Sequence, residues 1–64
     1  MSAAPDLYRY VDLAEAARRL GIRRRSAVAW LETLGVVRVV GGRRRVWLAD
    51  LQPERLAALE AAQK

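Results

Sequence analysis

Apolar residues along the chain recur at two different spacings, and each spacing predicts a type of element. Helical spacing is found in two stretches, at Leu13, Ala16, Ala17 and Leu20, and again at Ala27, Trp30, Leu31 and Leu34. Asp12 is a good N-cap for the first stretch, and Glu15 three residues later gives a capping-box arrangement. Gly21 suits the left-handed position after the first helix, and Gly35 the same position after the second. Two short helices joined by a tight turn predict a helix-turn-helix.

The start of the second helix is ambiguous in the sequence. Arg23 is a poor N-cap, so the helix can begin at Arg24, or Ser26 can cap a shorter helix.

A two-residue alternation follows, and Gly41-Gly42 at its centre predicts a β-hairpin with a two-residue turn. The expected cross-strand pairs are Val40 with Arg43, Val39 with Arg44, Arg38 with Arg45, and Val37 with Val46. One face, expected to pack on the core, carries Val37, Val39, Arg44, Val46 and Leu48. The other face carries Arg38, Arg43 and Arg45 beside Val36, Val40 and Trp47.

The ends of the chain complete the predicted fold. Residues 1–6 are expected to be disordered, and the β-prone stretch 7–11 can add a short strand before the first helix. Near the C-terminus Pro53 suits the first turn of a helix, which Asp50 or Gln52 can cap. Leu51, Leu56 and Leu59 give this last segment a short apolar stripe. The prediction is one α+β domain spanning residues 1–64, in the order helix, helix, strand, strand, helix.

Positive charge is concentrated in the middle of this chain of 64 residues with a net charge of +5. Residues 18–45 contain nine arginines and one acidic residue, Glu32, whereas the segments on either side are slightly acidic. Codon bias in a GC-rich genome can explain arginine in place of lysine, but it does not explain this clustering. A basic cluster of this kind is typical of proteins that bind nucleic acid.

Other classes of function find no support in the sequence. The chain has no cysteine and no histidine, and its carboxylates are scattered, so we expect no enzyme activity, no metal site and no cofactor. It has no signal peptide and no segment apolar enough to span a bilayer, so a cytoplasmic location is expected.

Two sets of residues are the candidates for DNA contact. The first is the start and exposed face of the second helix: Arg23, Arg24, Arg25, Ser26, Val28 and Ala29. The second is the hairpin: Arg38, Arg43, Arg44 and Arg45. Like charges opposite each other destabilise a strand pair, so Arg38 facing Arg45 is explained if phosphates lie between them. The alternatives are a solvated charge run on the helix, a capping role for Ser26, and edge-strand charge that discourages aggregation.

Residues 11–51 resemble the excisionase-like and MerR-like winged helix-turn-helix domains. The segment VDLAEAARRLGI is similar to their first helix, RRRSAVAW to the start of their recognition helix, and RVVGGRRRVWLADL to their wing. The chain departs from the pattern at Arg23, where a capping serine is usual, and at Val28 and Ala29, which replace larger polar residues.

The resemblance implies a small protein that binds double-stranded DNA. Because the chain ends soon after the wing, we expect no effector domain and no small-molecule ligand. A phage excisionase is then the expected role, with an integrase and neighbouring copies of the protein as partners. The alternatives are a small transcription regulator, the detached DNA-binding module of a larger assembly, or a protein-interaction module that docks acidic partners through the C-terminal helix.

Overall fold

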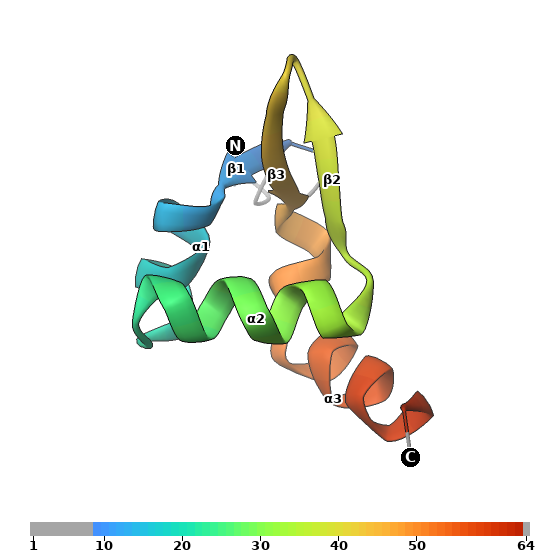
Figure 1. Cartoon of the computed structure of the whole chain (residues 1–64). Coiled ribbons are helices and arrows are strands. Elements are labelled where there is room, and N and C mark those ends of the chain that lie inside the picture. The colour runs from blue at the N-terminus through green and yellow to red at the C-terminus, as the bar shows by residue number, and fades with distance from the viewer. Residues whose placement is uncertain (1–8, 64) are drawn as a thin grey trace, which may run out of the picture.

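A computed structural model describes residues 9–63 and shows an α+β arrangement of three helices and a three-stranded antiparallel sheet. In chain order the elements are β1 (Tyr10–Asp12), α1 (Leu13–Leu20), α2 (Arg24–Leu34), β2 (Val37–Val40), β3 (Arg43–Trp47), the 3₁₀ turn η1 (Leu48–Leu51) and α3 (Pro53–Ala62). The β2–β3 hairpin rises above α2, and α3 lies on the opposite side of α2 from the hairpin tip (Figure 1). The predicted disorder of residues 1–6 lies outside the described residues.

The ends of the first two helices form as the sequence predicts. The Asp12 carboxylate accepts a hydrogen bond from the Glu15 backbone N–H at 2.8 Å. Gly21 and Gly35 both adopt left-handed backbone angles, with φ of 70° and 75°. Beyond Gly35 the N–H of Val36 donates to the carbonyl of Leu31 at 3.2 Å, which completes a Schellman-type cap. The turn at Gly21 brings α1 against α2, and the cap at Gly35 leads the chain from α2 into β2.

The hairpin register is the predicted one, with Val37 opposite Val46 and Arg38 opposite Arg45. The optional N-terminal strand is also present: β1 pairs with β3 and not with β2, so β3 is the central strand. The sheet is therefore three-stranded only near the base of the hairpin, where Val11 pairs with Val46.

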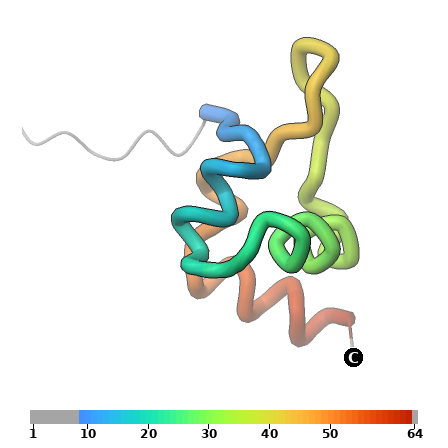
Figure 2. The backbone as a smooth tube through the Cα atoms, turned by 60° about the vertical axis from the view of Figure 1, so that its left-hand side comes forward, coloured from blue at the N-terminus to red at the C-terminus, as the bar shows by residue number. Residues whose placement is uncertain are grey.

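The core differs from the prediction at two valines of the hairpin. It contains Val11, Leu13, Ala16, Ala17, Ala27, Leu31, Leu34, Val36, Val46, Leu48, Leu51 and Leu56. Val39, predicted to face the core, is 74% exposed, because the hairpin extends past the helices and its outer half has nothing to pack against (Figure 2). Val36, predicted to lie on the opposite face, is buried, because the cap at Gly35 turns it inward before β2 begins.

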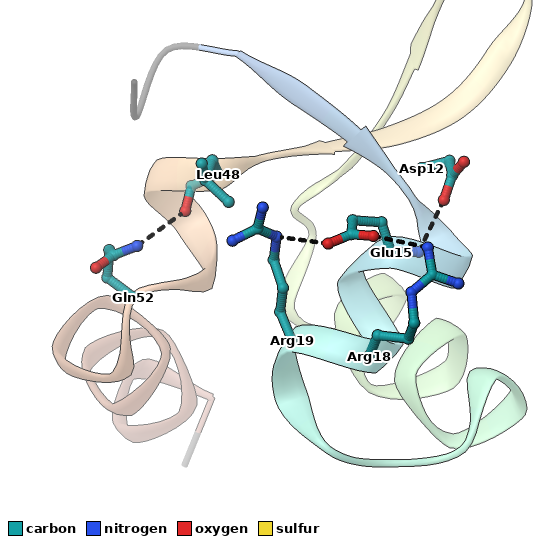
Figure 3. Close-up of polar contacts among 6 residues, drawn as sticks. All are labelled: Asp12, Glu15, Arg18, Arg19, Leu48 and Gln52. Carbon is teal, nitrogen blue, oxygen red and sulfur yellow. Dashed lines mark hydrogen bonds and ion pairs between the residues drawn. The ribbon is translucent and has the colours of Figure 1, made fainter. Parts of the chain in front are cut away.

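The last segment forms the expected helix but not the expected cap. Gln52 occupies the N-cap position without a side-chain capping bond, and its amide donates instead to the Leu48 carbonyl at 3.3 Å (Figure 3). Asp50 lies one turn earlier in η1, where it is buried and accepts a hydrogen bond from Arg55 at 3.4 Å. Leu51 and Leu56 join the core as predicted.

We predict that Leu31→Ala lowers the free energy of unfolding by about 2–5 kcal/mol, because it removes a side chain with no exposed surface. The matched control is Val39→Ala, which should change it by less than about 0.5 kcal/mol because Val39 is solvated. Urea titration of both variants measures the difference. Similar losses in the two variants would contradict this description of the core.

Candidate nucleic-acid interface

The N-terminus of α2 is not stabilised by its own side chains. The helix begins at Arg24, and Arg23 holds the N-cap position without a side-chain capping bond. Ser26 therefore lies inside the first turn and does not cap a shorter helix. No acidic residue lies in this turn, whereas α1 has Glu15 and α3 has Glu54. Because a helix N-terminus carries partial positive charge, three arginines here are unfavourable in the free protein.

The exposed face of α2 and the inner face of the hairpin border a shared, open depression of about 570 Å³. Its lining residues come from both elements and are Arg24, Arg25, Val28, Ala29, Glu32 and Arg44. A second depression adjoins it, in which Arg24 meets Arg43 and Arg44 beside the start of α1. The structure thus brings the start of α2 and the tip of the hairpin onto one surface, which we call the α2–wing surface.

The other two hairpin arginines lie elsewhere. The guanidinium carbon of Arg38 is 5.9 Å from the centre of the Trp47 ring, in a cation–π contact. The Tyr10 ring packs on the same tryptophan, with 5.7 Å between the two ring centres. Arg38, Trp47 and Tyr10 thus follow one another across the three strands of the sheet. Arg45 is half-buried and borders a depression shared with Arg43 and β1. Arg38 therefore has an aromatic partner within the protein, which offsets part of its repulsion by Arg45.

Two further arginines of the basic segment are paired on α1 and do not belong to the α2–wing surface. Glu15 accepts a hydrogen bond from Arg18 at 2.6 Å and forms an ion pair with Arg19, whose Nε lies 3.0 Å from Oε2 (Figure 3). The hydrogen bond from Arg18 lowers the pKa of the Glu15 carboxyl below its usual value. Arg19 also borders a depression on the α3 side, lined by Trp30 and Leu56. The unbalanced positive charge is thus left on α2 and the hairpin.

Sequence reasoning missed Glu32, which lies in the middle of the α2–wing surface. Its carboxylate is 3.3 Å from Nη1 of Arg44, and about half of each side chain is exposed. The position follows from helical spacing, since Glu32 is four residues after Val28 and seven after Arg25. Alternation placed Arg44 on the hairpin face that turns toward α2, but its pairing with Glu32 depends on how the hairpin extends over the helix, which the sequence pattern does not give.

Metal-site geometry and membrane-spanning helices among the described residues, and comparison with known proteins, give no evidence for a function. Among residues 9–63 no group of three or more acidic, histidine or cysteine side chains is placed to hold a metal ion. No helix in this range is long and apolar enough to cross a membrane. No family model, curated protein or solved structure matches the chain.

We predict that Arg23→Ser raises the free energy of unfolding by about 0.5–1 kcal/mol, because a serine at the N-cap accepts a hydrogen bond from the first turn. The backbone at Arg23 already has extended angles that suit a cap, with φ −65° and ψ 147°. Arg25→Ser removes the same charge inside the first turn and controls for electrostatics. Urea titration should show the larger gain for Arg23→Ser, and equal gains would contradict the uncapped start of α2.

Proposed function

We propose that this protein binds double-stranded DNA as a winged helix-turn-helix module, with α2 in the major groove and the β2–β3 hairpin as the wing. The observation that carries the proposal is the α2–wing surface, on which Arg24 and Arg25 of the helix meet Arg43 and Arg44 of the hairpin. The arrangement of three helices and a small antiparallel sheet is compatible with this fold.

The electrostatics of the surface favour a polyanion as its ligand. Guanidinium groups that converge on one depression repel each other, and those on α2 also oppose the helix dipole. Phosphate groups reverse both effects, because they neutralise the arginines and accept hydrogen bonds from the uncapped backbone N–H groups. The energy of binding therefore comes largely from counterion release and depends steeply on salt.

The depression also has the features needed to read bases. Arginine at the start of a recognition helix can bind the O6 and N7 atoms of guanine with two hydrogen bonds, and Arg24 and Arg25 are placed there. Val28 and Ala29 follow on the same surface and are short and apolar. Short side chains let the helix approach the groove closely, and their methyl groups suit the 5-methyl group of thymine.

The wing presents arginines on both of its faces. Arg44 lies on the side of α2, whereas Arg38 and Arg45 lie on the opposite face. A wing placed along the minor groove has a phosphate backbone on either side, so both faces can contribute. In this arrangement Arg38 and Arg45 contact backbone phosphates and carry no base information.

An excisionase-like architectural role is our proposal for the biological activity, and it rests on the sequence resemblance. Bending of the duplex and side-by-side binding to repeats, measured by electrophoresis on circularly permuted fragments, would support it. Binding of isolated sites without bending would favour a small transcription regulator. Little affinity for duplex DNA at moderate salt would instead favour the protein-interaction module, although the α3 carboxylates of Glu54 and Glu60 do not suit an acidic partner.

We predict that binding to random duplex DNA weakens with salt, with a slope of log K against log salt of roughly −5 to −7 if about six to eight phosphates are engaged. Arg24→Ala and Arg43→Ala should each weaken binding and reduce the magnitude of this slope by about 0.9. The control is Arg19→Ala, which removes the same charge on the α3 side and should leave the slope unchanged. Fluorescence anisotropy at several salt concentrations measures all four proteins, and an unchanged slope in both test variants would refute the proposed surface.

We also predict that a selected duplex contains thymine opposite Val28 and Ala29. Replacing that thymine by uracil removes only the 5-methyl group and should weaken binding by about twofold to fivefold, as expected for one lost methyl contact. Uracil at thymines outside the selected site is the matched control. Equal affinities for the two duplexes at every selected position would show that these residues do not read thymine.

A further inference from the structure

Glu32 is an acidic side chain on the α2–wing surface that neither phosphate binding nor helix capping explains, whereas Asp12, at the edge of this surface, caps α1. Glu32 is the only acidic residue between positions 18 and 45, and it lies where DNA would approach. A carboxylate at this position repels phosphates and weakens binding to any sequence. Its pairing with Arg44 is not a sufficient reason for its presence, because exposed ion pairs of this kind contribute little to stability.

The chemistry of the major groove offers Glu32 a narrow set of partners. A carboxylate only accepts hydrogen bonds, so it needs a donor on a base edge. Guanine O6 and N7 and thymine O4 are acceptors and repel it, whereas the N4 amino group of cytosine donates and is the usual partner of glutamate in this groove. Adenine also has an amino donor, at N6, but its neighbouring N7 is an acceptor that disfavours a carboxylate.

The contact between Glu32 and Arg44 couples base reading to phosphate binding. In the free protein Arg44 Nη1 lies 3.3 Å from the carboxylate, so Arg44 is partly neutralised. If Glu32 binds a base amino group, Arg44 is released from its partner and can bind a phosphate. On a sequence without that amino group, Glu32 either stays paired with Arg44 or lies against hydrogen-bond acceptors of the bases. Binding to such a sequence is therefore weaker.

We propose that Glu32 is a specificity-determining residue, which selects cytosine at one position of the DNA site by exchanging Arg44 for the cytosine amino group. This inference rests on the proposed DNA binding and deepens it, since it assigns a base preference to one side chain. Glu32 lies about one helical turn after Val28, so the selected cytosine neighbours the base pairs that Val28 and Ala29 approach.

The test compares Glu32→Gln with the wild-type protein by selection from random duplexes and by titration of non-specific DNA. The wild-type protein should enrich cytosine at one position. Glu32→Gln should lose that preference or exchange it for adenine, which glutamine binds through N6 and N7. Its affinity for non-specific DNA should rise by about threefold to tenfold, and the salt slope should become steeper by about 0.9 as Arg44 is freed.

Two further variants make the outcome decisive. Glu54→Gln changes the net charge equally on α3, away from the α2–wing surface, and should alter neither the selected sequence nor the slope. Glu32→Ala should lose the cytosine preference without gaining one for adenine, because alanine offers no hydrogen bond.

The possible failures have different meanings. If the wild-type protein binds no duplex DNA, the proposed function is wrong and this inference falls with it. If it binds, but Glu32→Gln selects the same sequence, the assignment of Glu32 is wrong alone. The assignment of Glu32 is wrong in this case even if Glu32→Gln binds non-specific DNA more tightly. Glu32 would then weaken binding to every sequence without reading a base.

Discussion

The apolar core that α1, α2 and β3 share is the constraint on which the site depends. Leu31 of α2 and Val46 of β3 have no exposed surface and belong to the same apolar cluster. Val46 is also paired on both sides, with Val11 and with Val37. Because this core is buried, and β3 is paired with a strand on each side at its base, α2 and the hairpin hold a fixed arrangement. The arginines at their outer ends are exposed, and they owe their arrangement to this core.

The arginines of this protein lie in two different electrostatic environments. Arg18, Arg19 and Arg55 each have a carboxylate partner supplied by a neighbouring turn. The arginines at the start of α2 have no acidic residue in their turn, and they oppose the helix dipole. At exposed positions this cost is about 0.3–1 kcal/mol for each charge. The surface is therefore less favourable in isolation than it would be with an anion bound.

The local parts of the fold could be predicted from sequence because each depends on a few neighbouring residues. Asp12, Gly21, Gly35 and the Gly41-Gly42 turn fixed the helix ends and the hairpin register. The predictions that were wrong concern burial, which depends on how the elements pack together. The burial of Val36 and the exposure of Val39 depend on where the helices end beneath the hairpin, which alternation alone cannot give.

The same reason limited the prediction of the site. The arginines of the helix and of the hairpin tip were predicted as DNA contacts, and the structure brings Arg24, Arg43 and Arg44 together. Whether they bind DNA stays a prediction. Arg38 and Arg45 were also predicted as DNA contacts, but they lie on the other face of the hairpin from Arg44, as strand alternation predicts, and Arg38 packs on the ring of Trp47. Glu32 was overlooked because a single acidic residue in a basic segment has no pattern of its own.

The sheet is three-stranded at its base and two-stranded toward its tip, because β1 pairs with β3 only from Arg45 to Trp47. The outer part, around Val39 and Arg44, has one hydrogen-bonded neighbour and little apolar cover. Local opening therefore costs less free energy at Gly41 and Gly42 than at the base of the sheet near Val46. Such a gradient lets the tip of the hairpin change its conformation while its base and the helix beneath it stay in place.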